Sequence, residues 1–195
     1  MQKSDLFDLI LAVRVILSDD LPIIVGSQAT HALSEVPPEV ALESVECDFL
    51  VFGGNAEARD RINEDLGVFS QFQRQRGYYA DALGLATAII PSGWQVRLQP
   101  LVGPDGDIVA NCIEVHDLAV SKLIAGREKD LEFLQDAIFS GLISVSTFLE
   151  RIVLVASQVE NDTISDRISR LIYVLKRNDV GHQVIDVMTR FIESH

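Results

Sequence analysis

The segment VECDFLVF at residues 45–52 carries the most informative strand pattern in this chain of 195 residues. Its odd-numbered positions are all apolar, whereas its first two even-numbered positions are Glu46 and Asp48. Because side chains alternate between the two faces of a strand, the pattern predicts that the odd positions face a core and that the two carboxylates share the other face. Gly53-Gly54 follows, and we expect it to end the strand.

The flanking sequence predicts further short strands and helices on both sides of this segment. A short buried strand over Ile23–Val25 ends at Gly26, and a helix is expected to begin at Ser27 or the next residue and to run to about Ser34. Residues 71–77 are polar and predict a loop. The remaining predicted helices are 4–18 and 56–66, and the remaining predicted strands are 87–90, 96–102 and 108–115.

From Asp117 onward the pattern changes, because apolar residues recur every three or four positions. The expected helices are 117–138, bent near Gly126, then 144–157, 162–177 and 180–193. The predicted fold class is α/β (α+β), with a mixed sheet flanked by helices over residues 1–116 and a helical C-terminal region over residues 117–195. The apolar stripes of the last helices predict self-association as a homodimer.

The composition disfavours several classes of function. The formal net charge is −13, and phosphate neutralisation needs clustered Lys and Arg, so broad nonspecific binding to nucleic acid is disfavoured. No apolar run approaches the roughly 20 residues that span a bilayer, and the N-terminus lacks the pattern of a signal peptide, so we expect a cytoplasmic protein with no membrane partner. Cys47 and Cys112 belong to no metal-binding pattern, so two reduced core thiols are expected rather than a zinc site.

Two features in the N-terminal part have the chemistry of a nucleotide site. Gly26-Ser27 lies at a predicted strand-to-helix junction, where glycine lets the backbone approach a ligand and free N–H groups suit phosphate. Glu46 and Asp48, two positions apart on one strand face, are able to bind Mg²⁺ between them. Each feature has a structural alternative, since Gly-Ser pairs also cap helices and alternate polar residues also face solvent on half-exposed strands.

A third feature lies in the segment SKLIAGREKD, residues 121–130. In this segment Lys122 or Arg127 would neutralise phosphate, and Asp130 would orient the lysine. An ordinary charged helix surface is the alternative explanation for the same residues.

Together the three features resemble the nucleotidyltransferase superfamily, and they look most like the bacterial branch that includes the abortive-infection toxin AbiEii and its uncharacterised relatives. The similarity is carried by Val25–Leu33, Ser44–Phe52 and Glu114–Phe133, within residues 20–140. The resemblance implies a nucleoside triphosphate substrate, Mg²⁺ as cofactor, transfer of a nucleotide to an RNA or protein acceptor, and an antitoxin as partner.

The resemblance also implies a role for each residue of the three features. The implied catalytic residues are Glu46, Asp48, Lys122 and Asp130, of which Glu46 and Asp48 are the metal ligands, and the implied nucleotide-binding residues are Gly26, Ser27 and Arg127.

Two departures from the family pattern favour a second interpretation. Active members usually carry Asp-x-Asp where this chain has Glu46-Cys47-Asp48, and the extra methylene of glutamate shifts a carboxylate whose placement matters to about 1 Å. The spacing from Ser27 to Glu46 is also longer than usual, and the best candidate for a third carboxylate is Glu114. The alternative function is therefore a catalytically inactive nucleotidyltransferase fold that acts as a binding or regulatory module.

Overall fold

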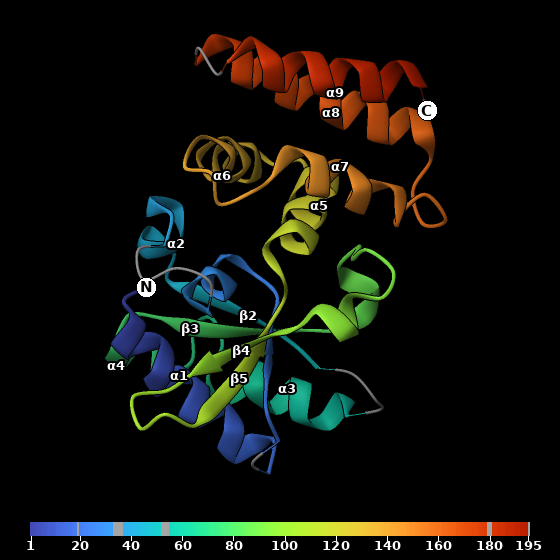
Figure 1. Ribbon diagram of the computed structural model, residues 1–195. Helices are drawn as coiled ribbons and strands as arrows, with labels where there is room; N and C mark the ends of the chain where they lie inside the picture. The colour runs from blue at the N-terminus through green and yellow to red at the C-terminus, as the bar shows by residue number, and fades with distance from the viewer. Residues whose placement is uncertain (19, 33–36, 52–54, 179–180, 195) are drawn as a thin grey trace. The chain divides into compact units, whose positions relative to one another are not determined.

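The computed structural model describes residues 1–195 except 19, 33–36, 52–54, 179–180 and 195 (Figure 1). Gly53-Gly54 and Ser34, the expected ends of a strand and a helix, lie outside the described residues. The chain divides into two compact units, the first made of Met1–Ala88 and Gln95–Glu114 and the second of Ile89–Trp94 and Val115–His195. The predicted division into two separate domains, residues 1–116 and residues 117–195, stays a prediction.

The first unit contains a mixed five-stranded sheet with the strand order β3-β2-β1-β5-β4. The strands are β1 (Ile23–Ile24), β2 (Glu46–Leu50), β3 (Tyr79–Leu83), β4 (Gln99–Val102) and β5 (Ile108–Cys112). β2 runs parallel to β3 and antiparallel to the short central strand β1, while β1 runs parallel to β5 and β5 antiparallel to β4. The informative segment of the sequence therefore lies between the centre and one edge of the sheet.

Helices flank this sheet, and α1 and α3 pack on one side of it (Figure 1). The α-helices are α1 (Lys3–Ile16), α2 (Glu39–Glu43), α3 (Ala56–Asp65) and α4 (Gln71–Arg76), and the 3₁₀ helices are η1 (Ser27–Ala32), η2 (Leu85–Thr87) and η3 (Trp94–Arg97). In β2 the odd positions Cys47 and Phe49 are fully buried, as the strand pattern predicted, but Val45 precedes the strand and is 50% exposed.

The segment 71–77 differs from the prediction, because it forms the helix α4 rather than a loop. Ser70 starts the helix, since its hydroxyl accepts a hydrogen bond from Gln73 N at 3.1 Å. Gly77 ends it with a φ of +83°, a conformation that favours glycine. Ser70 and Gly77 thus stabilise the two ends of a helix in a segment whose polar composition predicts a loop.

The strand predicted near residues 87–90 is also wrong, because the strand β3 lies earlier, at Tyr79–Leu83. Residues 85–87 form a 3₁₀ helix instead. The β-branched residues of 87–90 favour a strand locally, but pairing along the whole length of β2 places the strand at YADAL, where Ala80 and Ala82 are buried.

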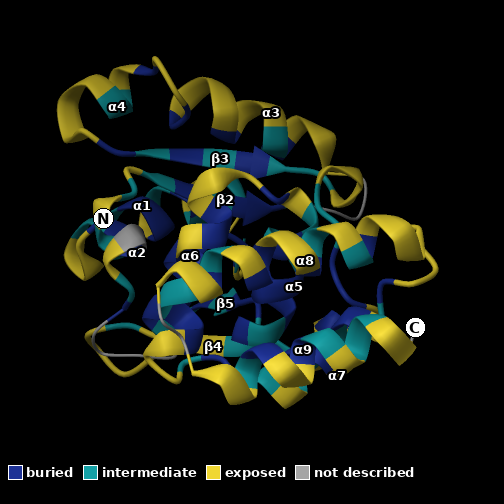
Figure 2. Ribbon diagram, turned by 90° about the horizontal axis from the view of Figure 1, so that it is seen from above, coloured by how far each residue is buried: buried dark blue, intermediate teal, exposed yellow. Residues whose placement is uncertain are grey.

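The described residues of the second unit form α5 (Val115–Ala125), α6 (Glu128–Phe139), α7 (Val145–Val153), α8 (Asn161–Arg177) and α9 (His182–Ser194). The single long helix predicted over 117–138 is two helices, because Gly126 has a φ of +62° and ends the first of them. The longest of the helices, α8, buries one side, including Ile168 and Leu171, and exposes the other (Figure 2).

The mixed sheet flanked by helices, together with the helical C-terminal region, confirms the predicted α/β (α+β) fold class. Within the described ranges of the chain, no helix combines the length and the apolar character that a membrane span requires.

Candidate functional site

Strand β2 carries the two predicted metal ligands. Glu46 and Asp48 occupy alternate positions and are half-buried, whereas Cys47 between them is fully buried. Burial, reinforced by the negative charge of Asp48, raises the pKa of the Cys47 thiol well above its usual value. The thiol therefore stays protonated at neutral pH, and the ionisable groups that remain on β2 are the two carboxylates.

Gly26 lies against the side chain of Asp48. Val25 N donates a hydrogen bond to the backbone oxygen of Asp48 at 3.0 Å, which brings the next residue, Gly26, beside that strand position. A Cβ atom added at Gly26 would overlap Asp48 Oδ2 and would lie 2.7 Å from its Cγ. Glycine is required here because any side chain would displace the carboxylate.

Ser27 begins the six-residue 3₁₀ helix η1, not the α-helix predicted at this point. The pattern is set locally, since Ala29 N bonds to Gly26 O at 3.0 Å and Thr30 Oγ1 donates to Ser27 O at 2.7 Å. Ser27 itself is only 8% exposed. A short 3₁₀ segment sums few peptide dipoles, so the helix-dipole argument for phosphate binding at Gly26-Ser27 is weaker than the sequence suggested.

Strand β3 adds two polar side chains that the sequence analysis did not assign to the site. Tyr79 pairs with Glu46, and Asp81 pairs with Asp48, in the parallel register of β2 and β3. The Tyr79 hydroxyl donates a hydrogen bond to Glu46 Oε2 at 2.9 Å. The carboxylate opposite Asp48 is therefore Asp81, not the predicted candidate Glu114, which lies between β5 and α5.

The electrostatics of this face reflect its concentration of negative charge. Burial and then the charge of Glu46 raise the pKa of Asp81. Burial and the hydrogen bond to Glu46 also raise the pKa of Tyr79 to about 12, so the phenol keeps its proton at neutral pH. A bound cation would offset the repulsion between these carboxylates.

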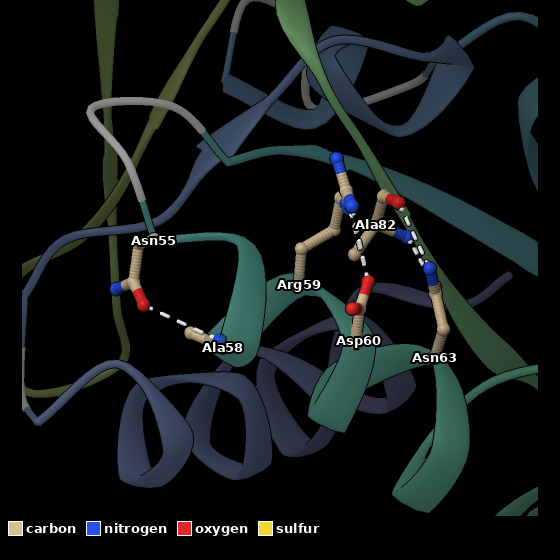
Figure 3. Close-up of polar contacts among 6 residues, drawn as sticks. All are labelled: Asn55, Ala58, Arg59, Asp60, Asn63 and Ala82. Atoms are coloured by element: carbon tan, nitrogen blue, oxygen red, sulfur yellow. Dashed lines mark hydrogen bonds and ion pairs between the residues drawn. The ribbon is translucent and has the colours of Figure 1, made fainter.

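The helix α3 holds β3 in place beside these residues. Asn63 Nδ2 donates to Ala82 O at 3.0 Å, and Asn63 Oδ1 accepts from Ala82 N at 2.7 Å (Figure 3). One side chain thus satisfies both backbone groups of a residue on the edge strand. Because Ala82 directly follows Asp81, the contact fixes the backbone next to that carboxylate.

The donor set of this face suits Mg²⁺ better than a metal that needs an all-protein cage. No three His, Cys, Asp or Glu side chains among the described residues form a ready-made metal group. Mg²⁺ is commonly held by one or two carboxylates together with waters and substrate phosphates. Glu46 and Asp48, two positions apart on one face, fit that mode of binding.

In the second unit, Asp130 joins the two predicted cations into one cluster. Its fully buried carboxylate accepts a hydrogen bond from Lys122 Nζ at 3.2 Å, and from Arg127 Nε at 2.7 Å and Arg127 Nη2 at 3.2 Å. Burial raises the pKa of Asp130, but the hydrogen bonds from Arg127 and the charge of Lys122 outweigh burial and leave the pKa below its usual value. Lys122 Nζ also lies 4.8 Å from the centre of the Phe133 ring.

A further cation, Arg167 of α8, lies at the turn between α5 and α6. A Cβ added at Gly126 would lie 2.6 Å from Arg167 Nη1, 2.8 Å from its Cζ and 2.9 Å from its Nε, so the guanidinium rests on the glycine. Arg167 Nε is buried and has no hydrogen-bond partner among the described residues. No local sequence pattern predicts this contact, because it joins segments about forty positions apart.

The predicted site residues thus fall into two groups, one in each unit. The first group contains Gly26, Ser27, Glu46 and Asp48, and the second contains Lys122, Arg127 and Asp130. Within the first unit Gly26 meets Asp48, and within the second Asp130 meets both cations. The convergence of the two groups on one nucleotide stays a prediction.

Comparison with known proteins identifies the family. Residues 4–184 match the model of the family described as a nucleotidyltransferase of unknown function, DUF6036. Neither the curated proteins nor the solved structures compared with the chain gave a match. Because the match to the family model spans most of the sequence, the chain belongs to DUF6036, a family of nucleotidyltransferases of unknown function.

Proposed function

We propose that this protein transfers a nucleotide from a nucleoside triphosphate to an RNA or protein acceptor in a Mg²⁺-dependent reaction. The observation that carries the proposal is the carboxylate face of β2 and β3, on which Glu46 and Asp48 occupy alternate positions of β2 and Asp81 pairs with Asp48. Burial, and then repulsion from the charge of Glu46, raise the pKa of Asp81 and so disfavour its ionised form. Binding of a cation offsets that repulsion, and membership of a nucleotidyltransferase family supports the same reaction.

In this proposal the residues of the first unit bind and orient. Glu46 and Asp48 would hold Mg²⁺, which when bound offsets negative charge on the phosphates during transfer. Gly26 keeps position 26 free of a side chain, so the Asp48 carboxylate retains its place. The buried Ser27 would line the phosphate side of the site with its backbone.

In the second unit, Lys122 and Arg127 would bind the phosphates. Asp130 acts as an orienting residue, because it hydrogen-bonds both cations and is itself fully buried. Lys122 and Arg127 bring two positive charges to this cluster, and such charges suit a polyphosphate.

We place the protein in the toxin-like branch, near AbiEii, with an antitoxin as partner and the cytoplasm as its location. The support is the combination of Gly26-Ser27, an acidic-x-Asp strand and the Lys122–Asp130 segment. Self-association as a homodimer is part of the same proposal.

The experiment is a transfer assay with each of the four α-labelled nucleoside triphosphates, with tRNA, total RNA or the protein itself as acceptor. We expect Mg²⁺-dependent labelling that chelation abolishes and that Asp48→Ala reduces by at least about 100-fold, as loss of a catalytic group commonly does. Asp105→Ala is the matched control, because Asp105 is an exposed acidic residue in the turn between β4 and β5 of the same unit. No labelling with any nucleotide or acceptor would contradict the proposal.

The alternative is a non-catalytic binding module, and Glu46 supports it. A glutamate stands where active relatives usually carry aspartate, and Tyr79 hydrogen-bonds one of its oxygens. If calorimetry detects binding of a nucleoside triphosphate and the labelling assay detects no transfer to any acceptor, the results favour this alternative.

A further inference from the structure

Glu46 and Tyr79 are register partners on the parallel strands β2 and β3, and their side chains are joined by a hydrogen bond. The Tyr79 hydroxyl donates to Glu46 Oε2 at 2.9 Å, and both residues are half-buried. The tyrosine hydroxyl carries the proton of this hydrogen bond, and the Glu46 carboxylate oxygen accepts it. The carboxylate of Glu46 is therefore held from the neighbouring strand.

The length of the glutamate side chain makes this contact important. Glutamate carries its carboxylate one C–C bond, about 1.5 Å, farther from the backbone than aspartate. It also has an additional torsion, so more conformational freedom is lost when the carboxylate is fixed. A metal ligand must be placed to within about 1 Å, and a hydrogen bond from Tyr79 limits the positions that the longer side chain adopts.

The hydrogen bond does not prevent binding of a cation. An ionised carboxylate has about four acceptor positions on its two oxygens, and Tyr79 uses one of them. Partners that hold a ligating carboxylate in this way commonly change metal affinity by 10-fold or more when they are removed.

We propose that Tyr79 is a positioning residue, whose hydroxyl fixes the Glu46 carboxylate as a ligand for a divalent cation and thereby adapts the site to glutamate at position 46. The inference rests on the proposed function, because it takes Glu46 and Asp48 as the cation ligands. It predicts that Tyr79 and Glu46 act as a pair, so the effect of removing the hydroxyl depends on the residue at position 46.

The experiment is a double-mutant cycle in which calorimetry measures Mn²⁺ binding to the full chain without nucleotide. The variants are Tyr79→Phe, Glu46→Asp, and the two together, with Asp48→Asn to identify the site. The matched control is Tyr78→Phe, because Tyr78 is the adjacent tyrosine and its hydroxyl donates to a different carboxylate, Asp8 Oδ2, at 2.7 Å.

We expect Tyr79→Phe to weaken Mn²⁺ binding about 10-fold and Tyr78→Phe to change it by less than about 2-fold. Glu46→Asp should also weaken binding, although aspartate is the commoner ligand, because the shorter side chain loses the Tyr79 contact. Adding Tyr79→Phe to Glu46→Asp should then have little further effect. Circular dichroism and thermal unfolding of each variant show whether it is folded.

The outcomes separate the two proposals. Mn²⁺ binding that Asp48→Asn abolishes but Tyr79→Phe leaves unchanged overturns the role of Tyr79 and leaves the proposed metal site standing. The role of Tyr79 is also overturned if Tyr79→Phe has the same effect with glutamate and with aspartate at position 46. It is overturned as well if Glu46→Asp binds Mn²⁺ as tightly as the wild type. This last result can be obtained even if Tyr79→Phe fails to fold. No binding of Mn²⁺ to the wild type overturns the role of Tyr79, whereas the labelling assay decides the proposed nucleotide transfer separately, because substrate phosphates commonly complete such a site.

Discussion

The carboxylate of Asp48 occupies the space in which a Cβ atom of residue 26 would lie. The contact joins the middle of β2 to the turn after β1, and the backbone bond from Val25 N to Asp48 O keeps these segments together. Two residues that are 22 positions apart in sequence therefore depend on each other. Position 26 needs a glycine because the predicted metal ligand fills the place of its side chain.

Gly26→Ala tests this dependence. The added methyl group overlaps Asp48 Oδ2, so we expect the carboxylate to move and the free energy of unfolding to fall by about 1 to 3 kcal/mol, the usual range for overpacking. Mn²⁺ affinity and nucleotide transfer should both decrease. Urea denaturation and calorimetry measure the two effects.

Gly84→Ala is the control for this variant, because Gly84 is in the same unit and, like Gly26, has a φ outside the left-handed region. A Cβ at Gly84 would meet only Arg59 Nη1, at 3.3 Å, which is the flexible end of a side chain. We expect stability to change by less than about 0.5 kcal/mol. Equal effects of the two substitutions would mean that the Asp48 contact is not the cause.

Asn63→Ala tests whether α3 holds the strand that carries Tyr79 and Asp81. The substitution removes both hydrogen bonds to Ala82, so we expect a loss of about 1 to 3 kcal/mol in unfolding free energy and faster amide exchange at Ala82. Asp60→Ala, one turn earlier on α3, is the control, since Asp60 is 70% exposed and pairs only with Arg59 in Figure 3. Unchanged exchange at Ala82 in Asn63→Ala would show that the strand needs no support from α3.

Features that depend on local periodicity were predictable from the sequence. The alternation in β2 predicted the buried Cys47 and Phe49 and the shared face of Glu46 and Asp48, because a period of two follows from the backbone itself. The helices of the second unit were equally visible, except that Gly126 divides the first of them.

Features that depend on pairing between distant segments were not predictable. YADAL contains two alanines and an aspartate, so its local preference for a strand is low, and its place is set by β2. For this reason Tyr79 and Asp81 were not predicted as site residues, and Glu114 was the predicted third carboxylate. The alternation of Tyr79, Asp81 and Leu83 with small buried residues was the available signal.

Gly126→Ala tests the contact between the α5–α6 turn and Arg167. Alanine at a φ of +62° destabilises by about 1 to 2 kcal/mol, and its methyl group would also displace the guanidinium. Gly141→Ala is the matched control, because Gly141 has a φ of +74° but nothing within 4 Å of an added Cβ. We expect Gly126→Ala to lose at least about 1 kcal/mol more than Gly141→Ala in urea denaturation, and equal losses would contradict a role for Arg167.

Asp130→Asn tests the charge cluster of the second unit through its pH dependence. The pKa of Asp130 is lowered from 3.8 in the folded protein, so its ionised form stabilises the fold above about pH 4, and this contribution disappears as the pH falls through the folded-state pKa. At pH 7 we expect Asp130→Asn to reduce the unfolding free energy by about 2 to 3 kcal/mol, less than for a fully enclosed pair because Arg127 is 61% exposed.

The difference between Asp130→Asn and the wild type should therefore shrink when urea denaturation is repeated at pH 5, 4 and 3. Glu132→Gln is the control, because Glu132 is an exposed acidic residue of the same helix, and its substitution should change stability by less than about 0.5 kcal/mol. A difference between Asp130→Asn and the wild type that stays constant from pH 7 to pH 3 would mean that shape, rather than charge, explains the effect. Lys122 and Arg127 would then be held by packing, and the orienting role of Asp130 toward phosphate would lose its physical basis.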